Sequence, residues 1–473
     1  MAIALVGCQN ADSRLGAPAR ATDVQAQVNN PAKATDVQAW VTDPANSLLF
    51  ERSDPAAHEP STGTDTIFVD PGTTYQEIDG FGWALTGGSA ALIHGMSAAA
   101  RAQLLEELFG HGEDSIGGSY LRVSIGASDL DPEVFSYAEV PGDVELEHFT
   151  LDRDRRHLIP ILKEILTVQP DLKIMGSPWS PPVWMKSNES SVGGTLLPRY
   201  HDVYAEYFVR YIQAMADEGI RIDAITPQNE PLHPGNNPSL LMPATQQATF
   251  IKESLGPAFE RAGIDTRIVI YDHNADRPDY PLTILDDPEA KAFVDGTAFH
   301  LYGGEIEALS TVRDRHPDRS IYFTEQWVGA PGSLARDLRW HVRELIVGAT
   351  RNWSRIVIEW NLAADQNQDP HTPGGCDRCL GAVTIQGDAV TRNPAYYIIA
   401  HAAKFVAPGS RRIASSASTA FPNVAFRRPD GGLVLVVLND TEARSEFAVR
   451  MGSRAFDAVL SEGAVATFLY HPN

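Results

Sequence analysis

Two glutamates, Glu230 and Glu325, each follow an apolar run that is typical of a buried strand, and 95 residues separate them. A carboxylate desolvated at the tip of such a strand without a partner costs roughly several kcal/mol, so folding alone explains it poorly. Two such groups that face each other can serve as a general acid/base and a nucleophile. Taken singly, each has a structural alternative: Glu230 precedes Pro231 in a turn, and Glu325 could pair with a nearby arginine.

Aromatic and polar residues follow other apolar runs in the same way. A lone tryptophan usually fills the core, but tryptophans gathered beside carboxylates are typical of a sugar site, because the C–H face of a pyranose packs on an aromatic ring. The aromatic candidates are Trp83, Trp179, Trp184, Trp327 and Trp360. The polar candidates are Asp129, Asn229 and Asn361 for sugar hydroxyls, with Arg122, His300 and Tyr302 beside the glutamates. A surface-loop role for Asp129 is an open alternative.

Eight short apolar runs alternate with amphipathic helices, which is the pattern of a parallel sheet with crossover helices. The predicted strands are 78–86, 120–126, 173–179, 223–229, 267–271, 296–302, 320–324 and 355–360. Eight such units predict an α/β fold, a (β/α)8 TIM barrel whose active site lies at the C-terminal ends of its strands. A doubly wound open sheet is the competing architecture, but no glycine-rich phosphate-binding motif follows the first strand.

Shorter strands separated by turns follow the last helix, predicted at 393–406. They are expected at 420–426, 433–438, 447–451, 456–460 and 464–470, with 66–70 joining them from before the barrel. The predicted domains are therefore a catalytic barrel over 77–406 and a β-sandwich built from 46–76 together with 407–473. Residues 1–45 are predicted to be a leader and a polar tether.

Composition limits the partners. The 38 basic and 61 acidic residues give a formal net charge of −23, which disfavours nucleic acids and anionic membranes. We expect a neutral β-linked oligo- or polysaccharide, or a glycolipid, as substrate, with no metal and no cofactor; the composition does not indicate an oligomeric state. Near the N-terminus, residues 5–8 resemble the lipobox of a bacterial lipoprotein with Cys8 as the lipid site, although four residues also match by chance. Export to the periplasm, the outer membrane or the medium is expected.

These residues together resemble glycoside hydrolase family 30, the retaining β-glycosidases that include glucosylceramidases and endo-β-1,6-glucanases. The resemblance runs from about Glu77 to the C-terminus and rests on Gly80–Gly82, Arg122, Ser177–Pro182, Asn229–Pro231, Thr324–Glu325 and Glu359–Leu362. It implies that Glu230 is the acid/base, that Glu325 is the nucleophile with Tyr302 in contact, and that Asp129, Trp179, Asn229 and Trp360 bind the sugar. Residues 326–327 and the loop 373–381 depart from the glucosylceramidase pattern.

That loop carries Cys376 and Cys379 in a C-x-x-C spacing. An exported context favours a disulfide; free thiols rank second, and a metal site ranks last because two sulfurs and His371 fall short of four ligands. We expect the bridge to stiffen a loop that forms part of the substrate site.

The predicted reaction is double displacement on a neutral β-glucoside. The favoured interpretation is that the protein is an endo-β-1,6-glucanase. Glucosylceramide or another β-glucoside is the enzymatic alternative, and a glycan-binding protein on an inactive barrel is the alternative from another class. Because Glu230 must hold a proton near neutral pH, it is expected to have the higher pKa of the two glutamates.

Overall fold

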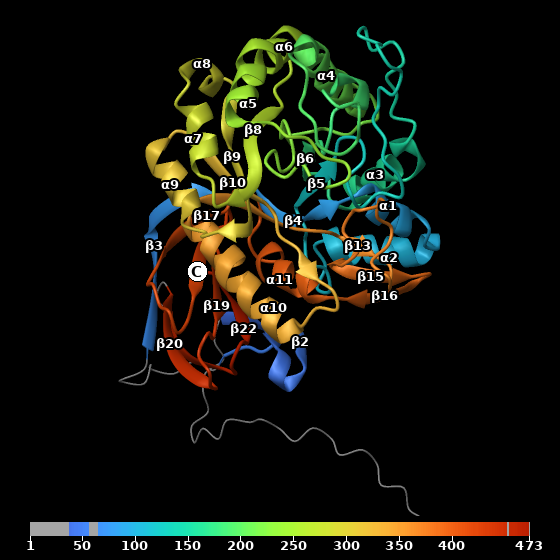
Figure 1. The fold of residues 1–473 in the computed structure, drawn as a ribbon. Helices are drawn as coiled ribbons and strands as arrows, with labels where there is room; N and C mark the ends of the chain where they lie inside the picture. The colour runs from blue at the N-terminus through green and yellow to red at the C-terminus, as the bar shows by residue number, and fades with distance from the viewer. Residues whose placement is uncertain (1–36, 56–64, 452–453, 473) are drawn as a thin grey trace, which may run out of the picture.

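The computed structural model describes residues 37–55, 65–451 and 454–472, which form a closed barrel and an adjoining sheet (Figure 1). The lipobox-like segment with Cys8 lies outside the described residues. Within the described ranges, no helix is long and apolar enough to cross a membrane.

The barrel has eight parallel strands in the order β10-β12-β4-β5-β6-β7-β8-β9. Their bounds are β4 Gly80–Leu85, β5 Tyr120–Ser124, β6 Lys173–Ser177, β7 Ala224–Ile225, β8 Arg267–Ala275, β9 Val294–Gly304, β10 Ser320–Glu325 and β12 Ser354–Glu359. The predicted TIM barrel is confirmed, although the fourth strand is only two residues long. Its interior is filled by one or two residues from most strands, among them Met175, Val269, Tyr322 and Ile358.

The closeness of the first two strands depends on a glycine. A Cβ at Gly82 would lie 1.8 Å from the carbonyl oxygen of Tyr120, so any side chain there would force β4 and β5 apart. The glycines that follow three of the helices differ in conformation. Gly219 and Gly263 adopt the left-handed conformation, with φ of 82° and 65°, whereas Gly110 follows its helix with φ of −70° and an extended backbone.

Helices surround the barrel. Those before β8 are α1 Gly87–His94, α2 Ala98–Phe109, α3 Leu158–Val168, α4 His201–Asp217, α5 Ala244–Phe250 and α6 Gly256–Ala262. Those after it are α7 Asp279–Leu285, α8 Pro288–Lys291, α9 Ala308–Arg315, α10 Leu334–His341 and α11 Pro394–Ala403. Helix α4 buries Tyr204, Phe208, Tyr211 and Met215 against the barrel, as its 3.6-residue periodicity predicts.

The second domain is a nine-stranded sheet that encloses its own apolar core and uses both ends of the chain. Its order is β2-β1-β22-β19-β18-β17-β3-β20-β21. The bounds are β1 Val37–Asp43, β2 Leu48–Arg52, β3 Asp65–Glu77, β17 Arg411–Ser415, β18 Asn423–Arg427, β19 Leu433–Leu438, β20 Ser445–Met451, β21 Arg454–Leu460 and β22 Val465–Tyr470.

The assignment of residues 1–45 to a tether is wrong for its last part. Residues 37–43 form strand β1, which pairs antiparallel with β22, and Val37 and Ala39 are buried in the core of the sheet. Gln38 and Thr42 interrupt the apolar residues of this strand, which makes the segment look polar, although Thr42 is itself buried against His401.

Candidate active site

A cavity of about 390 Å³ opens where the C-terminal ends of the barrel strands meet. Its lining includes eight residues predicted from the sequence: Asp129, Trp179, Asn229, Glu230, Tyr302, Glu325, Trp327 and Trp360. Cys376 and Cys379 also line it, together with Leu232, His233, Asn236, His273 and Asn274. Arg122 and His300 are buried behind this lining, where they contact the glutamates.

Arg122 on β5 organises the floor of the cavity. It is fully buried, and its guanidinium donates to Glu325 Oε2 at 2.6 Å, to Asn229 Oδ1 at 2.6 Å and to Asp272 Oδ2 at 2.7 Å. A fourth bond runs from Nε to Ser177 Oγ at 3.2 Å. One permanent cation therefore fixes side chains from four different strand ends, and the planar fork of arginine suits this task.

Glu325 ends β10 and keeps one oxygen toward the cavity. Tyr302 donates to Oε1 at 3.1 Å, while Arg122 holds Oε2. Burial raises the pKa of Glu325 above its ordinary value, although the charges of His300 and Arg122 oppose that effect. The carboxylate is held in one orientation by two donors, an arrangement suited to an attacking group.

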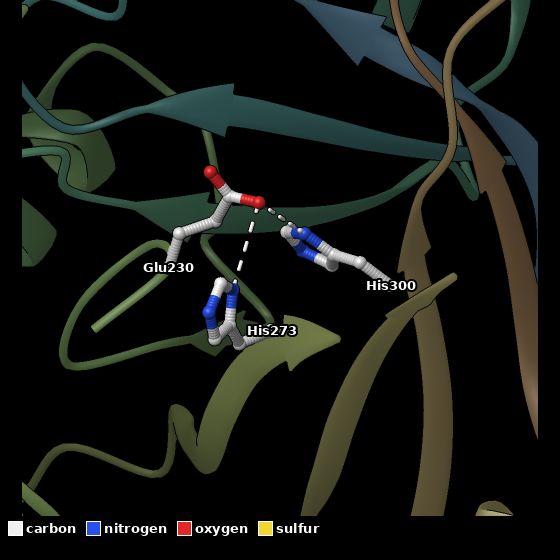
Figure 2. Close-up of side chains that lie close together, drawn as sticks. All are labelled: Glu230, His273 and His300. Atoms are coloured by element: carbon white, nitrogen blue, oxygen red, sulfur yellow. Dashed lines mark hydrogen bonds and ion pairs between the residues drawn. The ribbon is translucent and has the colours of Figure 1, made fainter. Parts of the chain in front are cut away.

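Glu230 faces two histidines, as Figure 2 shows. Its Oε1 lies 3.4 Å from His300 Nδ1 and 3.6 Å from His273 Nδ1. The backbone of Glu230 has φ of 44°, a left-handed conformation that costs a non-glycine residue about 1–3 kcal/mol, and its N–H donates to the Asp272 carbonyl at 2.9 Å. Strain of this kind concentrates at functional sites.

The expected order of the two pKa values is wrong for the substrate-free structure. Burial by itself would raise the pKa of Glu230, but the interactions with His273 and His300 bring it below its ordinary value. The expectation followed from the catalytic task alone and did not include these two imidazoles.

His300 links the two glutamates. Its Nδ1 lies 3.4 Å from Glu230 Oε1 and 3.7 Å from Glu325 Oε1, while Nε2 contacts Asp272 Oδ1 at 3.1 Å. Burial would lower the pKa of His300, but the charge of Glu325 and the bonds to Asp272 and Glu230 raise it to about 9. The ring is therefore protonated at neutral pH.

Because both glutamate oxygens contact the same nitrogen, their separation cannot exceed the sum of those two distances. That sum, 3.4 Å plus 3.7 Å, is 7.1 Å, which excludes the wide end of the range for inverting glycosidases, about 9.5 Å, but not its narrow end, about 6.5 Å. The arrangement places two carboxyls, one held by Arg122 and one beside a protonated imidazole, on facing sides of a single cavity.

Two of the predicted tryptophans form one wall. Trp179 and Trp360 stack with ring centroids 5.4 Å apart, and the guanidinium of Arg122 lies 4.9 Å from the Trp179 centroid. Trp327, partly buried, packs against this pair at the cavity. Such a wall offers the flat apolar surface that a sugar ring requires.

Three predicted residues lie elsewhere. Trp83 is buried outside the barrel against Phe109, and Trp184 donates to the Ala138 carbonyl at 2.8 Å, away from the cavity. Asn361 is buried and donates to Ala363 O at 3.0 Å, and it does not line the cavity.

Several site residues were missed. Asp272, His273 and Asn274 lie in the C-terminal half of β8, and none of them was predicted as a site residue. The signal was present, since the apolar run Ile268–Tyr271 is followed directly by these polar side chains. Asn236 and His233 come from the loop after β7 and carry no comparable signal.

Cys376 and Cys379 are joined by a disulfide whose loop holds Asp129. The Cys376 N–H donates to Asp129 Oδ2 at 3.2 Å, and a Cβ at Gly375 would lie 2.4 Å from the Asp129 carbonyl oxygen. Burial and the charge of Glu325 raise the pKa of Asp129 to about 6. The loop therefore contacts both the backbone and the carboxylate of Asp129 in the cavity wall.

Comparisons with known proteins match both domains of the chain to one family. The model of the glycosyl hydrolase family 30 TIM-barrel domain matches residues 78–406, and that of the family 30 beta sandwich domain matches residues 409–468. An endo-1,6-beta-D-glucanase of Neurospora crassa is 34% identical over 403 residues, which cover 80% of this chain and 82% of the relative. Lysosomal acid glucosylceramidase of Mus musculus is 29% identical over 440 residues, covering 86% and 84%.

Among solved structures, an endo-beta1,6-glucanase superposes with a TM-score of 0.87 at 35% identity. The superposition covers 93% of this chain and 100% of that one.

Proposed function

Because the chain belongs to glycosyl hydrolase family 30 and is a retaining β-glycoside hydrolase, we propose that its substrate is a β-1,6-linked glucan that it cleaves internally. The observation that carries this proposal is the pair Glu230 and Glu325, which share one imidazole at the mouth of the barrel beside a stacked tryptophan wall. The linkage is taken from the relatives that are named endo-1,6-beta-glucanases.

In the first step we assign the nucleophile to Glu325. Its Oε1 forms a bond to the anomeric carbon while the bond from that carbon to the leaving oxygen breaks, and Glu230 donates a proton to that oxygen. Glu230 must first gain this proton, because its pKa is low in the free site.

In the second step Glu230 removes a proton from a water molecule, whose oxygen bonds to the anomeric carbon as the ester to Glu325 breaks. Arg122 and Tyr302 stabilise the carboxylate that departs, since both donate to it in the free site. We assign Asp129 and Asn229, which line the cavity, to the sugar hydroxyls. The two inversions give a product of the same anomeric form as the substrate.

The test is a substrate panel followed by product analysis. The panel contains a linear β-1,6-glucan, a β-1,3-glucan, an aryl β-glucoside and glucosylceramide, each with the unmodified protein and with Glu325→Ala. We expect rapid shortening of the β-1,6-glucan to oligosaccharides, with the β-anomer of the new reducing end appearing first by NMR. Release of glucose alone, or no action on this polymer, would refute the endo-1,6 assignment.

Glucosylceramide hydrolysis is the second candidate, because the mouse lysosomal acid glucosylceramidase is similar over most of both chains. Release of ceramide in the same panel, without cleavage of the polymer, would establish it. A purely glycan-binding role would be indicated if every β-glycoside remained intact. We also propose that the protein acts outside the cytoplasm, since disulfides such as Cys376–Cys379 persist in oxidising compartments.

A further inference from the structure

The two histidines beside Glu230 have an arrangement that glycoside hydrolysis does not require. Glu230 Oε1, His273 Nδ1 and His300 Nδ1 converge on one point beside the cavity, and these ligand atoms all lie within 4.8 Å of one another (Figure 2). They come from three different strand ends. Two imidazole nitrogens and a carboxylate oxygen are the ligands that Zn²⁺ takes in sites with three protein ligands.

The distances fit such an ion. Zinc bonds nitrogen and oxygen at about 2.0–2.2 Å in a tetrahedron, so two of its ligand atoms stand about 3.4 Å apart. Glu230 Oε1 lies 3.4 Å from His300 Nδ1 and 3.6 Å from His273 Nδ1. Only the separation of the two imidazoles has to shorten, and a change in the side-chain torsion of His273 at the cavity wall can supply that movement.

His273 provides an independent observation. Its side chain is about nine-tenths buried, and its Nδ1 is a buried polar atom with no hydrogen-bond partner among the described residues. Glu230 Oε1 lies 3.6 Å from this nitrogen, beyond good hydrogen-bond distance. A buried nitrogen without a partner is costly, and one that points at a carboxylate and a second imidazole is placed to bind a cation.

The second ring nitrogen of His300 contacts a carboxylate, as it usually does in histidines that bind zinc. Its second nitrogen, Nε2, lies 3.1 Å from Asp272 Oδ1, and Asp272 also accepts from Thr324 and Arg122. Metal-ligating histidines usually donate their other N–H to a carboxylate, which fixes the ring and leaves the first nitrogen free for the ion.

The carboxylates around the point where these three ligand atoms converge favour a bound cation. Glu325 Oε1 is 3.7 Å from His300 Nδ1, and Asp272 and Asp129 are close by, whereas Arg122 is turned toward Glu325 and Asp272. We infer that Glu230, His273 and His300 form a site for Zn²⁺, and that its occupation blocks Glu230 and competes with substrate. The blocking part rests on the proposed function of Glu230; the binding part does not.

The first experiment measures binding without any substrate. Zinc chloride is titrated by calorimetry into the full chain, in a background of Cys8→Ser and His157→Ala. This background removes a thiol and breaks the surface pair His94–His157, whose Nδ1 atoms are 2.9 Å apart. We expect one zinc per chain, at least tenfold weaker binding in His273→Ala, and unchanged binding in His233→Ala, a histidine on the same cavity wall.

Cobalt supplies a measurement on the protein without a mutation at the site. Co²⁺ in a tetrahedral site of nitrogen and oxygen ligands gives an intense visible band, which excess Zn²⁺ should remove. Glu230→Gln, a substitution of equal size, should weaken the band if His273→Ala proves too unstable to purify. Zinc binding that is equal in folded His273→Ala and unmodified protein would overturn the inference, as would the absence of a one-to-one site.

Inhibition is tested last. Zinc should raise the KM for an aryl β-glucoside with little change in kcat, and the zinc concentration for half inhibition should rise at least tenfold in His273→Ala. Inhibition that does not depend on substrate concentration would overturn the blocking role. Lack of activity on every glycoside would remove the proposed function, while the calorimetric result would still decide whether the zinc site exists.

Discussion

His401 connects the barrel to the nine-stranded sheet, and its burial predicts a loss of stability in mild acid. The side chain lies on α11, is fully buried, and contacts Thr467 on β22 at 2.9 Å and Thr42 on β1 at 2.8 Å. The Thr467 hydroxyl donates its only proton to the His401 carbonyl at 2.8 Å. Nδ1 must therefore donate to that hydroxyl, and Nε2 accepts from Thr42, which requires a neutral ring.

The size of the effect follows from the pKa. Burial lowers the pKa of His401 from 6.5 to about 3. At pH values between these two, the unfolded chain binds a proton on this residue and the folded protein does not. The stabilisation is complete above pH 6.5 and is lost progressively as the pH falls toward 3. At about pH 5 the free energy of unfolding should be lower by about 2 kcal/mol, since each pH unit below the unfolded pKa removes roughly 1.36 kcal/mol.

Urea unfolding of the unmodified protein and of His401→Gln, at about pH 7 and about pH 5, measures this effect. Other groups titrate in the same range: burial raises the pKa of Asp131 and of Asp154 to about 7, which favours the folded state as the pH falls. Both proteins share these groups, so the difference between their pH responses isolates His401. Identical responses would refute the assignment of a buried neutral histidine.

Three further predictions concern the site. Glu325→Ala should abolish turnover but keep sugar binding, and azide should restore product formation with inverted anomeric configuration by NMR; substantial activity without azide would contradict its role as nucleophile. Arg122→Met should lower the free energy of unfolding by about 3–5 kcal/mol, because Asp272 is left buried without its cation, and a change below about 1 kcal/mol in urea unfolding would show that the pair is not structural. The double variant Cys376→Ser, Cys379→Ser should raise the KM for the glucan and alter the preference between polymer and aryl glucoside, since the loop fixes Asp129; an unchanged preference would argue against this.

The barrel was predictable because each of its strands is an apolar run that differs clearly from the flanking helices. The roles of individual residues were harder to predict from the sequence, because each role depends on the face of the strand from which the side chain projects. Trp83 shares the outward face of β4 with Phe81, so it packs against helices although it lies near the same strand end as the site. Reading alternate residues along each strand would have removed it from the candidates.

Contacts between distant strand ends could not be read from the sequence. Asp272 pairs with Arg122, 150 residues away in the chain, and neither residue type nor spacing indicates this partner. The same holds for β1, whose alternating pattern becomes informative only when β22 is placed beside it. The local periodicity of hydrophobic residues predicts helices and strands, whereas the pairing of strands far apart in the chain decides which polar side chains meet.

The interleaving of β1 and β3 with strands from the C-terminal part of the chain has a consequence for synthesis. β1 pairs with β22, and β3 lies between β17 and β20, so the first strands to leave the ribosome wait for partners made after the entire barrel. During that interval they present unpaired edges, which invite association between chains. The C-terminal strands therefore both complete the sheet and cover the unpaired edges of β1 and β3. A chain shortened at its C-terminus should consequently aggregate and should not fold into a smaller active enzyme.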